Sequence, residues 1–400
     1  MTDVLPAALL LVQLAAASRV VWRLLPGRRR LPPVAPRATG PSDTTVTVVV
    51  ATLNEAHRIG PCLAGLQAQG LPLLETLIVD SRSTDGTRDL VEAAGRQDPR
   101  IRLLTDAPLP PGWVGKVWAL ETGLRHARGE WVLGLDADIE PTPGLVGAVV
   151  TAARRQRLDV VSFAPRFTDQ TAGERWLQPA MLATLLYRVG ATGSGPAEPE
   201  RAMANGQCFL ARRDVLERHG GYAPARDSFC DDVSLARHLA RRGVRVGFLD
   251  GSRLYRVRSY TSAAETWREW GRSFDLSDAA GPARQALDLA TVTLAQGLPL
   301  VVLAVLGIAV ALGVPLLPHP ADVRVPAAWA LVALLGLNVA LVVMRLLLLV
   351  ATRGSYERRG WPYWLSVTAD PAAVLRLWLS TLRRPRAWRG RRYTLLGTVE

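Results

Sequence analysis

The chain has 400 residues, of which 49% are hydrophobic, and a formal net charge of +13 at pH 7. This length exceeds one average domain, and the apolar content predicts either a large core or a membrane portion. The arginines cluster beside apolar runs, which argues against a nucleic-acid-binding protein. The three cysteines and five histidines are scattered, so their spacing indicates neither a disulfide framework nor a zinc site.

Residues 1–25 are predicted to form an N-terminal transmembrane helix, because Val4–Trp22 is an apolar run. Arg23 and the arginines at 28–30 follow the end of this run instead of preceding it, which is the opposite of a secretory signal peptide. The positive-inside tendency therefore places the N-terminus outside and the following residues in the cytoplasm. A linker rich in proline and arginine, residues 26–45, comes next.

Residues 46–285 show an alternation of strand and helix patterns. The β-branched run Val46–Thr52 is typical of a strand buried on both faces, and a helix is predicted from Ile59. Leu77–Asp80 reads as a second strand, followed by a helix that continues through Arg96. This alternation predicts an α/β domain with a mostly parallel sheet and crossover helices.

Acidic side chains follow the ends of the predicted strands. The strand Trp131–Leu135 ends directly before Asp136 and Asp138. Ligands of open α/β sheets bind beyond the carboxyl ends of strands, so Glu55, Asp80 and this pair are expected at one edge. Aspartates at i and i+2 can both reach one Mg²⁺ or Mn²⁺, which adds substrate phosphates to its ligands. Ordinary turn aspartates are the alternative. No P-loop or dinucleotide-binding turn is present in the sequence.

A second pair of aspartates, Asp231 and Asp232, precedes residues with helical spacing and is predicted to lie at a helix N-terminus. Two interpretations remain open. The pair could cap the helix and complement its dipole. Alternatively, one member is a general base, since a carboxylate beside a like charge has a raised proton affinity.

Two long apolar runs in the C-terminal part, Leu289–Leu317 and Ala327–Val350, predict a transmembrane hairpin within residues 286–352. The remaining residues, 353–400, are basic and rich in tryptophan. This composition is typical of a helix that lies in the headgroup region of a bilayer. A fourth membrane span, which would place the C-terminus outside, is the alternative.

Six stretches of the sequence, taken in order, carry a family resemblance. They are VVVATLNEAHRIGPCLAGL, LIVDSRSTDGT, GWVGKVWAL, LGLDADIEP, NGQCFLARRDVLERHGGY and DDVSLARHLARRG. Over roughly residues 46–275 the chain resembles the family 2 glycosyltransferases with the GT-A fold. Within that family it is most similar to membrane-attached enzymes that glycosylate isoprenoid lipids, namely the carotenoid glycosyltransferases and the hopanoid-associated group. Asp370-Pro371 and the stretch Trp388–Tyr393 resemble the carotenoid branch.

The resemblance implies an inverting, metal-dependent transfer of a sugar from a nucleotide sugar, such as a UDP-sugar, to a membrane isoprenoid lipid. A hydroxyl or carboxyl of a carotenoid or hopanoid would accept the sugar. Asp232 would be the catalytic base, and Asp231 beside it stands where glutamate is commoner in the family. The protein would be a multi-pass protein of the cell membrane, with its catalytic domain in the cytoplasm.

The resemblance also implies residues that bind the donor. Asp80 would contact the nucleotide base, and Asp136 and Asp138 would hold Mg²⁺ or Mn²⁺ together with the diphosphate. The full set expected on the donor side is Thr52, Glu55, Asp80, Lys116, Asp136 and Arg272.

The chain departs from the family pattern at two places. Many relatives read DDGSTDGT, whereas this chain reads DSRSTDGT, so Ser81 and Arg82 replace an acid and a glycine. The nearest match to the QxxRW motif of processive members, Glu269–Ser273, lacks the glutamine and the tryptophan. This argues against polymer synthesis. A processive or phosphoprenol-dependent glycan synthase is the alternative function. A third is a non-catalytic membrane protein whose GT-A domain only binds a nucleotide or a partner.

Lys116 is the only lysine among 48 basic residues. It lies near Gly112 and Gly115, which permit close approach of the backbone. An ammonium on a flexible stem contacts a phosphate or a hydroxyl as a point charge, whereas the planar guanidinium of arginine needs more room. We therefore expect Lys116 to lie in a loop and to face the donor diphosphate or the acceptor. A chance surface lysine is the alternative.

Overall fold

The computed structural model describes most of the chain, in two compact units. The described residues are 4–39, 43–193, 198–258, 260–274, 279–313, 326–382, 387–388 and 391–392. The first unit, called here the sheet unit, comprises Arg29–Thr168, Thr192–Ser259 and Pro385–Glu400. The second, called the helical unit, comprises Met1–Arg28, Asp169–Ala191 and Tyr260–Arg384.

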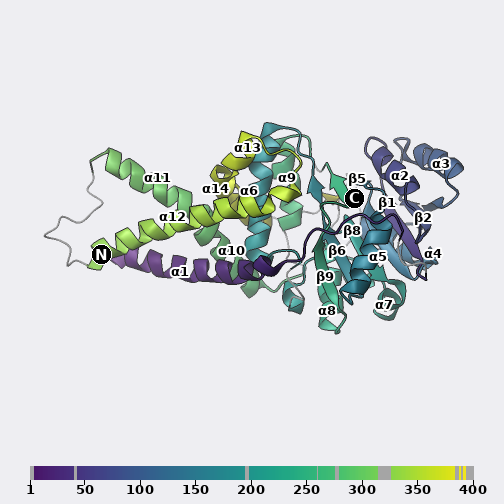
Figure 1. The fold of residues 1–400 in the computed structure, drawn as a ribbon, viewed down its shortest axis with the longest axis horizontal. Coiled ribbons are helices and arrows are strands. Elements are labelled where there is room, and N and C mark those ends of the chain that lie inside the picture. The colour runs from purple at the N-terminus through teal and green to yellow at the C-terminus, as the bar shows by residue number, and fades with distance from the viewer. Residues whose placement is uncertain are drawn as a thin grey trace. The chain divides into compact units, whose positions relative to one another are not determined.

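A seven-stranded sheet of order β3-β2-β1-β4-β8-β6-β9 forms the sheet unit's centre (Figure 1). The strands are β1 (Val46–Thr52), β2 (Leu73–Asp80), β3 (Ile101–Thr105), β4 (Trp131–Asp136), β6 (Val160–Ala164), β8 (Cys208–Arg212) and β9 (Val246–Asp250). Only β8 runs antiparallel to its neighbours β4 and β6 within this sheet. The mostly parallel arrangement confirms the predicted α/β fold.

Helices pack against both faces of this sheet. Along β1 the side chains alternate, so that Val48 and Val50 share an apolar cluster with α2 and α5, whereas Val49 shares another with α4 and α8. The sheet unit's helices are α2 (Ile59–Gln67), α3 (Thr87–Gln97), α4 (Gly115–His126), α5 (Leu145–Arg155), α7 (Arg213–Arg218) and α8 (Asp231–Arg241). A smaller sheet combines β5 (Ile139–Pro141), β10 (Tyr255–Val257) and β7 (Arg166–Phe167). Burial on both faces explains why β1 reads as a continuous apolar run.

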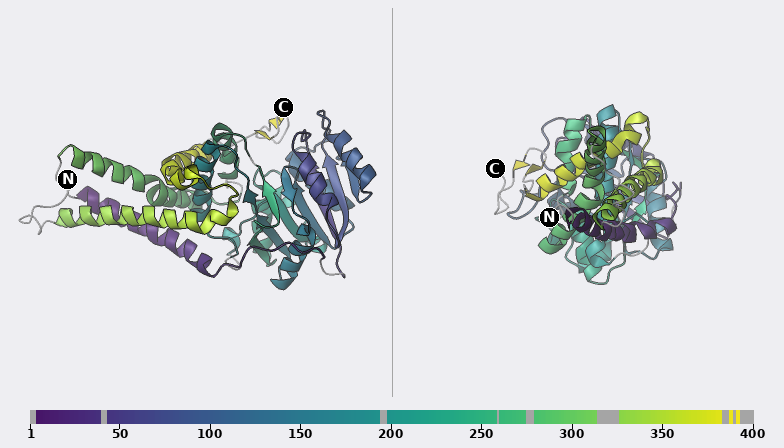
Figure 2. Two further views of the ribbon diagram at one scale, coloured as in Figure 1. Left: turned by 45° about the horizontal axis from the view of Figure 1, so that its top comes forward. Right: turned by 90° about the vertical axis from the view of Figure 1, so that its left-hand side faces the viewer.

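Among the described residues, three stretches are long and apolar enough to cross a membrane, Leu5–Arg29, Pro282–Ala311 and Trp329–Ser355, and all lie in the helical unit except for the terminal Arg29. The helices of this unit are α1 (Val4–Leu24), α6 (Ala172–Val189), α9 (Ala263–Phe274), α10 (Pro282–Val292), the π-helical η4 (Thr293–Gly297), α11 (Leu298–Ala311), α12 (Pro326–Thr352), α13 (Trp361–Trp364), the 3₁₀ turn η7 (Leu365–Ala369) and α14 (Asp370–Leu382). Helices α1, α11 and α12 run side by side, with α12 against both others (Figures 1 and 2). The predicted turn of the hairpin lies outside the described residues.

Polar residues that interrupt the apolar runs point into the helical unit. Gln13 of α1 and Asn338 of α12 exchange hydrogen bonds of 3.0 Å in both directions. Arg345 of α12 forms an ion pair of 3.1 Å with Asp370, and both side chains are 3% exposed. Buried polar groups in apolar surroundings are stable when they are paired in this way. The Arg345–Asp370 ion pair connects α12 to the start of α14 in the tail. Within residues 353–382 no helix beyond Ser355 has membrane-spanning length.

The sheet unit is discontinuous within the range 46–285 that the sequence predicts as one domain. Asp169–Ala191 and the residues from Tyr260 onward belong to the helical unit. Helix α6 is the cause, because Leu177 and Met181 are buried in an apolar cluster of that unit. The alternation of strands and helices in the sequence does not indicate that α6 leaves the sheet unit.

Gly123 places α4 directly on β1, and its replacement is predicted to destabilise the fold. A methyl group at Gly123 would collide with Val49, whereas one at the exposed Gly60 of α2 would meet no atom within 4 Å. We expect Gly123→Ala to lower the free energy of unfolding by about 1–3 kcal/mol. Gly60→Ala, the matched control, should raise it by up to about 1 kcal/mol. Urea denaturation of the detergent-solubilised protein measures both, and equal effects would contradict the packing described here.

Candidate active site

The ends of β2, β1 and β4 meet at one edge of the sheet. The register pairs Thr52 with Asp80 and Ala51 with Asp136. Asp80 and Asp136 therefore flank the end of β1 at nearly the same level. The predicted convergence of acidic strand ends is confirmed.

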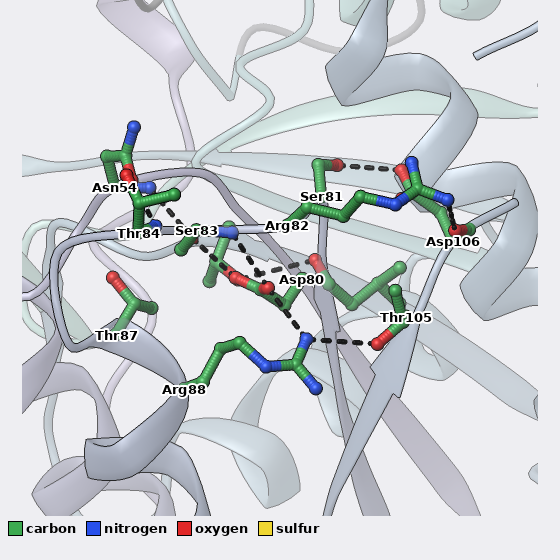
Figure 3. Close-up of polar contacts among 12 residues, drawn as sticks. Asn54, Asp80, Ser81, Arg82, Ser83, Thr84, Thr87, Arg88, Thr105 and Asp106 are labelled. Carbon is green, nitrogen blue, oxygen red and sulfur yellow. Dashed lines mark hydrogen bonds and ion pairs between the residues drawn. The ribbon is translucent and has the colours of Figure 1, made fainter. Parts of the chain in front are cut away.

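Asp80 is fully buried and is surrounded by donors (Figure 3). Its Oδ1 accepts hydrogen bonds from the hydroxyls of Ser83 and Thr52, at 2.5 and 3.3 Å. Its Oδ2 accepts the Ser83 amide and forms an ion pair with Arg88, each at 3.0 Å. The carboxylate thus ties the loop after β2 to the start of α3. A nucleotide base would have to replace one of these donors to bind Asp80.

The two residues that depart from the family pattern connect the ends of β2 and β3. The Ser81 hydroxyl donates to Oδ2 of Asp106 at 2.7 Å, and the Arg82 guanidinium donates to the Asp106 carbonyl at 3.3 Å (Figure 3). Arg82 has a φ of +63°, in the left-handed region where glycine is at ease. Arg82 thus adopts a backbone conformation that favours glycine, and its side chain contacts Asp106.

Lys116 lies at the centre of the acidic residues. It stands in the first turn of α4, and its Nζ is 2.7 Å from Oδ1 of Asp136. The prediction that Lys116 lies in a loop is wrong, because Val114 donates to the Arg226 carbonyl at 2.6 Å and α4 starts directly after it. Burial opposes the charge of the ammonium, but Asp136 and the aspartates of α8 outweigh burial and raise the pKa of Lys116.

Asp231 and Asp232, called here the acidic pair, begin α8 as the sequence predicts. Oδ2 of Asp232 accepts the Gly206 amide at 2.6 Å, and its Oδ1 accepts the Val233 amide at 2.8 Å. Burial raises the pKa of both carboxyls, that of Asp231 to about 7, while Lys116 opposes the shift. Asp231 has a pKa near neutral pH, and Asp232 is oriented by two amides. Both have properties expected of a proton acceptor.

Asp136 and Asp138, called here the β4 aspartates, supply oxygen ligands at the same edge. Asp138 lies 4.0 Å from the Arg58 guanidinium, and its side chain is 16% exposed. Burial, followed by the charges of Asp138 and Asp136, raises the pKa of the Cys62 thiol beneath them. Among the described residues no group of three or more His, Cys, Asp or Glu side chains forms a self-sufficient metal site. Two partly exposed carboxylates nevertheless fit Mg²⁺ or Mn²⁺, which completes its shell with phosphates and water.

Gly206 is a residue of the site that the sequence patterns do not predict. Besides donating to Asp232, it leaves space for Lys116, since a Cβ at this position would lie 3.0 Å from Nζ. The sequence offers one signal for it, its place in the stretch NGQCF, whose last two residues begin β8.

The other predicted residues occupy different surroundings. Thr52 is buried and donates to Asp80, and Glu55 is buried after β1, with its amide donating to Thr87 at 2.9 Å. Arg272 lies in α9 of the helical unit, and its side chain is outside the described part of the structure. The structure therefore brings together Lys116, Asp136 and the acidic pair but does not relate Arg272 to them.

Residues 47–220 match the family model described as Glycosyl transferase family 2. These residues form a family 2 glycosyltransferase domain. The chain is 27% identical over 135 residues to an uncharacterized glycosyltransferase of Escherichia coli (strain K12), which covers 34% of this chain and 38% of the relative. It is 34% identical over 111 residues to a dolichyl-phosphate beta-glucosyltransferase of Trichomonas vaginalis, which covers 26% of this chain and 32% of the relative. The chain thus spans less than two fifths of the length of these two relatives.

A solved structure shares the fold of the glycosyltransferase domain and its flanking helices. The mannosyltransferase PcManGT from Pyrobaculum calidifontis, in complex with GDP-Man and Mn²⁺, aligns with a TM-score of 0.55 at 23% identity. The alignment covers 96% of this chain and 99% of that protein. The predicted GT-A fold is confirmed.

The raised pKa of Asp231 predicts a pH dependence of stability. Between about pH 4, the ordinary carboxyl value, and pH 7, the folded protein binds a proton that the unfolded protein releases. The free energy of unfolding should therefore fall as the pH rises through this window and level off above it. We expect Asp231→Asn to remove this contribution, whose slope is at most about 1.4 kcal/mol per pH unit.

Urea denaturation from pH 4 to pH 8 without divalent cations measures the difference between Asp231→Asn and the wild type. The exposed Asp227, four residues earlier, provides the control variant Asp227→Asn. Parallel pH profiles for Asp231→Asn and the wild type would contradict the raised pKa.

Proposed function

We propose that the protein transfers a sugar from a nucleotide-sugar donor, such as a UDP-sugar, to a hydroxyl or carboxyl of a membrane isoprenoid lipid of the carotenoid or hopanoid type. One observation carries the proposal. The sheet unit, which contains the family 2 domain, sets the acidic pair around Lys116 and beside the β4 aspartates, and the described part of the chain has three stretches apolar enough to cross a membrane. An acceptor that dissolves in the bilayer suits an enzyme attached to it.

The chemistry follows from the positions of the carboxylates. Asp232 is held by the amides of Gly206 and Val233, so its carboxylate is oriented before an acceptor arrives. It would take the proton of the acceptor hydroxyl while that oxygen attacks the anomeric carbon, and inversion follows from this single displacement. Asp136 and Asp138 would hold a divalent cation, which when bound offsets negative charge on the departing nucleoside diphosphate. Burial raises the pKa of Asp232 and so strengthens its proton affinity.

A phosphoprenol acceptor, or a glycan built on one, is the second candidate. It is favoured by the partial similarity to a dolichyl-phosphate beta-glucosyltransferase. The degenerate QxxRW stretch in α9 speaks against a processive enzyme. The labelled lipid can be extracted and treated with mild acid to distinguish the two acceptors. Mild acid releases a sugar from a prenyl phosphate but leaves a glycoside intact.

The substitution Asp232→Asn tests the catalytic assignment. Removal of a general base lowers the rate by a factor on the order of 10²–10⁴, while binding of the nucleotide should stay unchanged. Transfer of radiolabelled sugar from a panel of nucleotide sugars into the lipids of membranes that contain the protein measures this. Asp214→Asn, a change in an aspartate that is 48% exposed on α7, is the control. Full activity of Asp232→Asn would refute the assignment of the base.

We also propose that the tail lies at the membrane interface and that the catalytic domain is cytoplasmic, with the N-terminus outside. On α14 one face is buried, whereas Leu375, Trp378 and Leu382 are 54%, 40% and 74% exposed and share the other face. Trp361 of α13 is 80% exposed, near the exposed Arg358 and Arg359. Exposed tryptophan and leucine beside arginine are typical of the headgroup boundary.

Spin labels on the full chain in nanodiscs test the tail. A label at Leu382→Cys should collide several-fold more with oxygen, relative to a water-soluble nickel complex, than a label at Asp214→Cys, because oxygen concentrates in lipid. The three native cysteines are buried and compete little for the label. Equal accessibility of the two labels to the nickel complex would place the tail in water and contradict the proposal.

A further inference from the structure

The contact between Lys116 and Asp136 has a consequence for binding of the divalent cation. Nζ lies 2.7 Å from Oδ1 of Asp136, one of the two aspartates that would hold that cation. The Lys116 side chain is 18% exposed and that of Asp136 is 28% exposed, so dissolved ions reach both. An ammonium and a divalent cation on one carboxylate repel each other, and the surrounding protein strengthens this repulsion relative to water.

The surroundings offer the ammonium other anions. The acidic pair at the start of α8 attracts Lys116 together with Asp136. A donor diphosphate held next to the β4 aspartates would add further negative charge within reach of the flexible stem. Lys116 thus has carboxylate partners in the donor-free protein and would have a second kind of anionic partner, a diphosphate, once a donor is present.

We propose that Lys116 is a positioning residue that moves between two anions. In the donor-free protein it neutralises Asp136 and keeps the carboxylates of the site together, and with cation and nucleotide bound it contacts the donor diphosphate instead. The inference rests on the proposed function, because it presupposes a nucleotide-sugar donor with a divalent cation at the β4 aspartates.

The proposal explains why this position is lysine in a chain that otherwise uses arginine. A Cβ at Gly206 would lie only 3.0 Å from Nζ, so there is little room for the larger guanidinium. Arginine also binds a carboxylate through two parallel hydrogen bonds, which would make Asp136 harder to release. A compact ammonium with freely rotating donors exchanges one anion for another more easily.

The single lysine makes a direct measurement on the wild-type protein feasible. Lysine labelled with ¹⁵N at Nζ yields one side-chain signal, that of Lys116, in the full chain in detergent. We expect Mg²⁺ to shift this signal as it displaces the ammonium, and UDP added with Mg²⁺ to shift it again. No shift at concentrations of Mg²⁺ and UDP that calorimetry shows to saturate the protein would overturn the proposal.

Variants provide the second measurement, with Mn²⁺ binding followed by electron paramagnetic resonance of the free ion. Lys116→Met should bind Mn²⁺ up to about tenfold more tightly than the wild type when nucleotide is absent, because one competing charge is gone. With Mn²⁺ present, the same variant should bind UDP several-fold more weakly. Lys116→Arg should bind Mn²⁺ no more tightly than the wild type does.

Arg218→Met is the control, since it removes one positive charge from an exposed ion pair with Asp214 on α7 without touching Asp136. It should leave Mn²⁺ binding unchanged. Mn²⁺ binding by Lys116→Met that is no tighter than in the wild type refutes the exchange while the proposed function stands. A wild-type protein that binds neither Mn²⁺ nor UDP refutes both.

Discussion

Mutual repulsion of carboxylates is the constraint on which this site depends. Several acidic side chains lie at one sheet edge, at the ends of β1, β2 and β4 and at the start of α8. Most of them are at least partly buried, so their carboxylates have lost part of their hydration. Asp80 is balanced by Arg88 and by hydroxyl and amide donors. Asp136 and the acidic pair share one ammonium, that of Lys116. The position of α4, which carries this lysine, therefore decides whether the site can form.

The packing of the sheet unit fixes that position. Helix α4 lies against β1 through Gly123, where no side chain fits between the helix and Val49. Its first turn is held by the hydrogen bond from Val114 to the carbonyl of Arg226, a few residues before α8. The lysine and the acidic pair are thus tied to each other through the backbone as well as by charge. Gly206 completes the arrangement by supplying an amide to Asp232 and space to Lys116.

The sequence predicts those features that depend on local patterns. Continuous β-branched runs identify β1 and the end of β2, and the order of strands and helices predicts a parallel sheet with acidic residues at one edge. The saturation of Asp80 and the helical setting of Lys116 depend on contacts between distant segments, so no local pattern reveals them. Helix α6 lies within the range 46–285 that the sequence predicts as one domain, and the burial of Leu177 and Met181 places it in the helical unit.

We propose that a soluble sugar donor and a membrane lipid meet at this site. Mass spectrometry of total lipids from otherwise identical cells, with and without the protein, tests this proposal. We expect a lipid species that is present only with the protein and that exceeds an isoprenoid lipid of the control cells by the mass of one sugar residue. An unchanged lipid profile together with an altered polysaccharide would refute the proposed acceptor.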